Sequence, residues 1–218
     1  MNKYITEFIG TFFLVLVVGL TAVYVKEAAA LAALAIGGTL MVMIFMGGHI
    51  SGGHYNPAVT LACLLRGATS WGDAAAYWVV QIAGGLAGAF LAAYLVIDPV
   101  AAPAFAPAHV VDGTKLVQAL INEVLFTFAL ASVVLNTATS KDHPNNSFYG
   151  LAIGFTVVCG AIAGGGISGG AYNPAVGIGH IVKCGQIPHI WVYIAAPLVG
   201  GLLAAIVFRV CNPHEYNA

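Results

Sequence analysis

Charged residues are scarce in this chain: 218 residues contain 7 Lys or Arg and 8 Asp or Glu, for a formal net charge of −1. Soluble domains carry a charge on about a quarter of their residues, so a chain with 7% charged residues falls outside that class. The small net charge excludes nucleic acid as a partner, and no basic cluster marks a site for anionic lipid. The composition implies no soluble protein partner either.

Cysteine is also scarce, and its placement is uninformative about chemistry. The four cysteines form no Cys-x-x-Cys or His-rich spacing, so the sequence predicts neither a metal site nor a disulfide framework. We expect packing thiols, which is the usual role of a buried free cysteine. No cofactor is predicted.

Apolar residues, in contrast, make up 60% of the chain, and the mean hydropathy is +0.93. A helix needs about 20 apolar residues to cross about 30 Å of hydrocarbon. The first such run contains Glu7 and lacks a small-residue cleavage site, so we predict a retained helix rather than a signal peptide. The predicted spans lie near Tyr4–Tyr24, Ala28–Gly48, Ala74–Ile97, Val117–Ala138, Phe148–Gly165 and Ile190–Val210. The chain is thus predicted to be an all-α integral membrane protein embedded in a lipid bilayer.

The sequence contains an internal repeat, covering approximately residues 4–99 and 115–212 of a single 1–218 membrane domain. An offset of 117 residues aligns 16 of the 26 positions from Leu34 to Val59 with the second half, and an offset of 116 aligns Glu7 with Glu123. Each repeat has three spans, so the second enters the membrane from the opposite side. Inverted repeats place the functional site near the bilayer midplane, where the halves meet.

Each half carries one Asn-Pro-Ala tripeptide after a glycine-rich stretch. Asn is a natural N-cap and Pro a natural first helical residue. The helix from Pro57 to Arg66 would measure about 15 Å, half a membrane, so both helices are predicted to be re-entrant. Irregular backbone at this depth must face protein or a water-filled cavity, which predicts carbonyl acceptors along a pore at His49, Ile50, Ser51, Gly52, Gly166, Ile167, Ser168 and Gly169.

The two tripeptides predict the centre of that pore. Helix N-termini that meet end to end bring two partial positive charges together, which repels cations, and the Asn amides can donate to a passing oxygen. The residues predicted at the pore centre are Asn56, Pro57, Ala58, Asn173, Pro174 and Ala175.

These motifs resemble those of the aquaporin, or major intrinsic protein, family, and the resemblance covers the whole chain. It rests on Glu7-x-x-Gly-Thr11, the lead-in from Gly48 to His54, both Asn-Pro-Ala boxes, and Gln81 followed by Gly84, Gly85 and Gly88. The resemblance implies a right-handed bundle of six transmembrane helices and two re-entrant half-helices, a pore in each protomer, a homotetramer, and passive passage of water or small uncharged solutes.

The resemblance also implies an outer selectivity filter at Ile36, Ala161, Gly170 and Val176. Family members usually place an arginine directly after the second Asn-Pro-Ala, with aromatic or histidine residues opposite. Here Val176 takes the place of the arginine, which removes a positive charge and up to five hydrogen-bond donors. We therefore expect a wide, apolar filter that passes glycerol, urea, ammonia or metalloid acids as well as water.

Ionisable residues at membrane depth are functional candidates. Proton relay is one hypothesis for Glu7 and Glu123, but their symmetry favours a scaffold role, in which each accepts hydrogen bonds from the loop of its own half. His54 is predicted in the cytoplasmic vestibule. His49 and His54 could sense pH, or they could be ordinary loop histidines with satisfied hydrogen bonds.

The predicted function is a passive channel. The alternatives are a strict water channel, an ion-coupled transporter with broken helices, and a structural membrane protein. An intramembrane enzyme is disfavoured because no nucleophile and base are paired by spacing. We predict a multi-pass protein of the cell (inner) membrane with both termini cytoplasmic, which places Lys3, Arg66, Lys141 and Arg209 inside, against Lys26, Lys115 and Lys183 outside.

Overall fold

The computed structural model describes residues 1–23, 31–96, 113–185 and 187–216, and every regular element in these ranges is helical. Six helical segments are long and apolar enough to span a membrane. Two shorter helices, α3 and α7, begin at the prolines of the two Asn-Pro-Ala motifs. The α-helices are α1 (Asn2–Val18), α2 (Ala32–Ser51), α3 (Pro57–Arg66), α4 (Trp71–Leu95), α5 (Gly113–Val134), α6 (Tyr149–Ser168), α7 (Pro174–Cys184) and α8 (Val192–Cys211).

Short π-helical turns extend α1 through Gly19–Val23 and α5 through Leu135–Thr139. A 3₁₀ turn at Ile187–His189 precedes α8, and a second 3₁₀ turn at Pro213–Glu215 follows α8. The all-helical membrane fold predicted from the sequence is thus confirmed. Four residues named in the sequence predictions lie outside the described residues: the span ends Tyr24, Ala28 and Ile97, and the lysine Lys26.

The second and fifth spans differ from prediction because both run three residues further, to Ser51 and Ser168. The glycines in these segments do not interrupt the helix. Each helix instead ends at a glycine with positive φ, at 90° for Gly52 and 91° for Gly169, a conformation that glycine adopts without steric cost.

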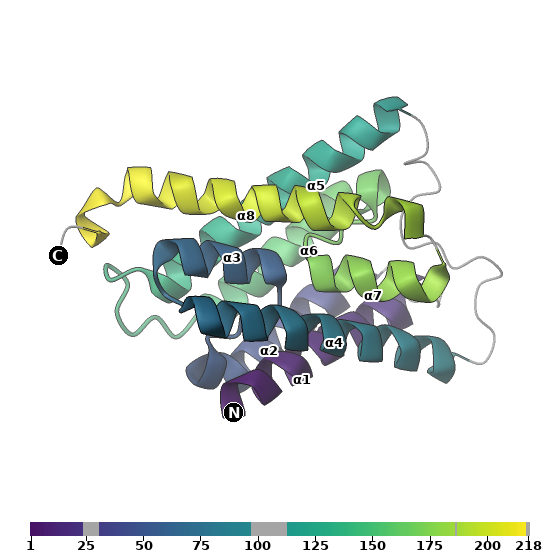
Figure 1. Ribbon diagram of the computed structural model, residues 1–218, viewed down its shortest axis with the longest axis horizontal. Coiled ribbons are helices and arrows are strands. Elements are labelled where there is room, and N and C mark those ends of the chain that lie inside the picture. Colours follow the sequence, from purple (N-terminus) through teal and green to yellow (C-terminus); the bar gives the residue numbers. More distant parts are fainter. Residues whose placement is uncertain (24–30, 97–112, 186, 217–218) are drawn as a thin grey trace.

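The helices pack in corresponding pairs in the two halves: α1 packs on α4, and α5 on α8, while α2 and α6 pack on each other across the halves. Figure 1 shows α3 and α7 lying roughly in line between α4 and α8, with α3 toward the end of the bundle that carries both chain termini. We call that end the termini side. Both half-helices are thereby held in the interior, where they meet at their N-termini.

Two glycines allow the long helices to contact the half-helices backbone to backbone. A Cβ added at Gly85 of α4 would lie 2.6 Å from the carbonyl oxygen of Ala175, and one at Gly201 of α8 would lie 2.4 Å from that of Ala58. Both distances are too short for any side chain. The last span of each half therefore holds the Asn-Pro-Ala motif of the other half, at a close crossing of the kind that small residues allow in membranes.

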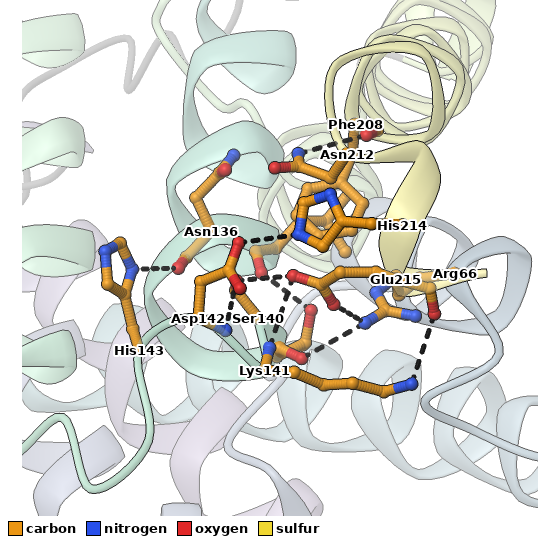
Figure 2. Close-up of polar contacts among 12 residues, drawn as sticks. Arg66, Asn136, Ser140, Lys141, Asp142, His143, Phe208, Asn212, His214 and Glu215 are labelled. Atoms are coloured by element: carbon orange, nitrogen blue, oxygen red, sulfur yellow. Dashed lines mark hydrogen bonds and ion pairs between the residues drawn. The ribbon is translucent and has the colours of Figure 1, made fainter. Parts of the chain in front are cut away.

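On the termini side, the C-terminal turn is fastened to α3 by an ion pair between Arg66 and the buried Glu215 (Figure 2). The Arg66 guanidinium also contacts the neighbouring rings of Phe208 and Tyr216, 4.9 and 5.0 Å from their centroids. Burial disfavours the Glu215 carboxylate, but hydrogen bonds from the Ser140 hydroxyl and the Lys141 N–H, together with the charge of Arg66, hold its pKa below the ordinary value.

Candidate functional site

The N-termini of α3 and α7 are joined by reciprocal hydrogen bonds between the two halves of the chain. Each motif asparagine caps its own helix: the Oδ1 atoms of Asn56 and Asn173 accept from the N–H groups two residues further on, at 2.8 and 2.9 Å. Each then donates from Nδ2 across the centre, Asn56 to the carbonyl of Tyr172 and Asn173 to that of Tyr55, both at 2.9 Å. The centre is therefore fixed by four hydrogen bonds from two side chains.

This arrangement determines what the asparagines can offer to a solute. A side-chain amide carries two N–H groups, and one of them is taken by the opposite half. One N–H remains on each of Asn56 and Asn173, and both residues line the same cavity. Together with the partial positive charge of two helix N-termini, these donors suit an oxygen atom and oppose a cation.

Tyr55 and Tyr172 adopt a backbone conformation that is rare for residues with side chains, with φ of 47° and 50°. Their N–H groups donate to Oε2 of Glu7 and of Glu123, each at 2.7 Å. The carboxylates thus stabilise the turn that directs each tyrosine carbonyl to the opposite asparagine.

Glu7 accepts four hydrogen bonds within its own half. Besides the Tyr55 N–H, the donors are the Ser51 hydroxyl at 2.7 Å, the His54 N–H at 3.0 Å and the Gln81 amide at 2.8 Å. Glu7 is fully buried and lines neither of the two cavities described below. A carboxylate with four donors is a structural acceptor, as the scaffold hypothesis requires, and its oxygens are occupied.

Glu123 repeats this pattern with one donor fewer. The Ser168 hydroxyl donates at 2.6 Å and the Ala171 N–H at 3.0 Å, in addition to Tyr172. The position that corresponds to Gln81 in the second half is Pro197, which has no side-chain donor. The scaffold is therefore asymmetric between the halves.

A cavity of about 420 Å³ lies on the side of the pore centre away from the termini. One water molecule takes about 30 Å³ in the liquid, so this cavity holds several. All four positions predicted for the filter line it, together with both asparagines: Ile36, Ala161, Gly170, Val176, Asn56 and Asn173.

A second cavity, of about 390 Å³, opens on the termini side. His54 and Val134 line both cavities and therefore mark the boundary between them. Both cavities are lined by residues from both halves of the chain.

Comparison with known proteins agrees with this geometry. The family model of the major intrinsic proteins matches residues 1–208. The chain belongs to the major intrinsic protein family. As a member, it is a membrane channel for the passive passage of water and small solutes.

Among relatives of this major intrinsic protein is a glycerol uptake facilitator protein-like 6 from Lactiplantibacillus plantarum, which is 38% identical over 99% of this chain and 100% of its own length. A probable aquaporin TIP2-2 from Oryza sativa subsp. japonica is 34% identical, over 98% of this chain and 90% of its own. The solved aquaglyceroporin from Plasmodium falciparum has a TM-score of 0.80 with full coverage of this chain and 99% of its own. That last match, at 20% identity, supports the fold.

Only part of the backbone predicted to line the pore borders the two cavities. Ile50, Ser51 and Gly52 line the cavity on the termini side and Gly169 lines the other, but four predicted positions line neither: His49, Gly166, Ile167 and Ser168. The reason is that α2 and α6 continue as helices to their final serines. The carbonyls of Ser51 and Ser168 accept from the hydroxyls of Tyr77 and Tyr193, and so they are occupied.

His54 lines both cavities, whereas His49 is exposed on α2. The ring Nδ1 of His54 lies 3.1 Å from Oγ1 of Thr60, which donates to the Asn56 carbonyl and accepts from Gln81. The tautomer of His54 decides which of these two atoms donates to the other. Reasoning from the sequence missed Thr60; its signal was its position one turn after the N-cap.

Proposed function

We propose that this channel passes small uncharged solutes larger than water, in addition to water itself. The observation that carries the proposal is that Ile36, Ala161, Gly170 and Val176 line one cavity with both asparagines and supply no charged, aromatic or histidine side chain. The glycerol uptake facilitator-like relative supports the same solute class.

The chemistry of the cavity wall favours solutes with both hydroxyl and methylene groups. Most of its lining is apolar, including Leu14, Val18, Leu130 and Ile153, while the polar groups gather at the asparagines. A polyol or urea can contact the apolar wall and direct an oxygen to an asparagine N–H, because a ligand site of this kind needs only a few well-placed polar groups. Glycerol has both kinds of group, whereas urea, ammonia and undissociated metalloid acids are included as small solutes without charge.

The width at Gly170 is fixed by the backbone. Its φ is 67°, and an added Cβ would lie 3.2 Å from Cα of Gly165 and 3.3 Å from the hydroxyl of Tyr172. A larger residue there would be strained, so the size of the filter is set by the residues that can vary, Ile36, Ala161 and Val176.

Cation exclusion is assigned to the pore centre in this proposal. No arginine lies at the filter positions, so the barrier comes from the two helix N-termini and the absence of a carboxylate on the cavity wall among the described lining residues. Glu7 and Glu123 are fully buried, line neither cavity and accept four and three hydrogen bonds from their own halves. They therefore lie out of reach of an ion in the cavities, which favours a channel over an ion-coupled transporter.

We further propose a homotetramer in the cell (inner) membrane with both termini cytoplasmic. The assignment of both termini to one side is supported by the bundle itself: α1 begins and α8 ends toward the same end (Figure 1), as an even number of spans requires. Lys3, Arg66 and Lys141 also lie on that side. An excess of basic residues is typical of cytoplasmic loops.

The test is stopped-flow light scattering on proteoliposomes with uncharged solutes of rising diameter. After hypertonic shrinkage in glycerol or urea, vesicles with the channel should re-swell faster than empty vesicles at the same lipid load. Non-saturating flux that ignores ion gradients would separate a channel from a transporter. Fast water flow without glycerol or urea entry would overturn the proposed solute range.

A further inference from the structure

A cluster of metal-ligating side chains forms on the termini side, outside the pore. Asp142 belongs to the connection between α5 and α6, whereas His214 and Glu215 belong to the C-terminal turn. Each offers one ligand atom, and the three atoms all lie within 4.8 Å of one another. Figure 2 shows the His214 imidazole directed toward the Asp142 carboxylate, with the Glu215 carboxylate beside them.

We propose that Asp142, His214 and Glu215 bind a divalent transition-metal ion of the zinc class. Donor atoms about 2.1 Å from a common ion lie about 3–3.5 Å from one another. His214 Nε2 and Asp142 Oδ2 are 2.8 Å apart, so a small outward shift of two exposed side chains admits the ion between them. Glu215 is the third ligand, and water completes the coordination.

The donor set selects the class of ion. An imidazole with two carboxylates suits Zn²⁺, Ni²⁺ or Cu²⁺, whereas Mg²⁺ and Ca²⁺ prefer oxygen ligands throughout. The two carboxylates are offset by the cations Arg66 and Lys141, which contact Glu215. The local charge therefore adds little attraction for a divalent cation, and the imidazole must supply the selectivity for the zinc class. We expect micromolar affinity for Zn²⁺, weaker than that of a structural zinc site.

The ligands are held in place in different ways. Glu215 is buried and fixed by Arg66, Ser140 and Lys141, so one donor is preorganised. The side chains of Asp142 and His214 are 56% and 58% exposed, which gives the ion access from solvent. A bound ion would cross-link the C-terminal turn to the α5–α6 connection. Because Asp142 and His214 are 72 residues apart, no spacing motif marks this site.

The test is Zn²⁺ titration of the full-length, tag-free protein in detergent, by competition with a chromophoric chelator. Loss of a side chain that hydrogen-bonds to a metal ligand typically lowers metal affinity about 10–100-fold. His214→Ala and Asp142→Asn change the ligands themselves and should each weaken Zn²⁺ binding at least tenfold. His143→Ala is the matched control, since His143 is also exposed on this face but contacts the Asn136 carbonyl instead. It should bind like the wild type.

Two further measurements sharpen the outcome. X-ray absorption on the Zn²⁺-loaded wild type should show one imidazole among oxygen ligands, and Zn²⁺ should raise the melting temperature of the wild type but not of His214→Ala. The proposal is overturned if His214→Ala binds as tightly as wild type, if His143→Ala loses as much affinity, or if Mg²⁺ competes with Zn²⁺ at equal concentration. The first two results would leave Asp142 and His214 as a surface ion pair only, and the third would show a site without the selectivity of an imidazole ligand.

Discussion

Replacement of Gly201 by alanine tests whether backbone contact between α8 and α3 holds the pore centre. The new Cβ would lie 2.4 Å from the Ala58 carbonyl oxygen, and an ordinary contact begins at 3.4 Å, so the two helices must separate by about 1.0 Å. Overpacking of this kind costs about 1–3 kcal/mol. The shift also strains the 2.9 Å bond from Asn56 to the Tyr172 carbonyl, and loss of a hydrogen bond adds about 0.5–1.5 kcal/mol.

The measurement is the melting temperature in detergent, together with water permeability at equal protein load in proteoliposomes. Gly201→Ala should lower both. Gly72→Ala is the matched control: Gly72 also lies in a long helix, but nothing stands within 4 Å of its added Cβ. Its stability should stay the same or rise slightly, because alanine favours helix over glycine. If Gly201→Ala melts and conducts like Gly72→Ala, the half-helix is not held by this contact.

Three further predictions concern the filter, the scaffold and the C-terminal turn. Val176→Arg should reduce glycerol flux about tenfold, equivalent to about 1.4 kcal/mol on the barrier, and leave water flow measurable; unchanged glycerol flux would place Val176 outside the constriction. Gln81→Met removes the hydrogen bonds from Gln81 to Glu7 and Thr60 and should lower the free energy of unfolding by about 1–3 kcal/mol. A variant that melts like the wild type would contradict this role of Gln81. Arg66→Met leaves the Glu215 carboxylate buried without its cation and should lower the free energy of unfolding by about 3–5 kcal/mol. The control is Arg209→Met, which removes a cation near the Tyr216 ring but breaks no ion pair with a carboxylate. It should cost much less in the same melting assay.

The fold was largely predictable because hydropathy and the repeat are local or periodic signals. Six apolar runs and two Asn-Pro-Ala motifs in corresponding positions are sufficient to place six spans and two half-helices. The ends of α2 and α6 were less predictable. Glycine-rich stretches from Gly47 and Gly164 suggest irregular backbone, yet glycine is tolerated in membrane helices, and only the positive φ of Gly52 and Gly169 ends them.

The site was predictable in its residues but only partly in its contacts. Repeat symmetry pointed to Glu7 and Glu123 as acceptors for their own loops. The bonds from Asn56 and Asn173 to tyrosine carbonyls of the opposite half depend on how the halves dock, and no sequence spacing encodes that. The C-terminal cluster likewise joins elements without any shared period, so no sequence pattern marks it.

The exchange of hydrogen bonds between the halves has a consequence for biogenesis. The first half is synthesised first, but its Tyr55 carbonyl and Asn56 amide find their partners only when Tyr172 and Asn173 have entered the membrane. Unsatisfied polar groups in hydrocarbon are costly, so the N-terminus of α3 is not stable at the bilayer midplane before the second half is present. Insertion of the outer helices can therefore proceed in order along the chain, whereas closure of the water path must wait until the last third of the protein is made.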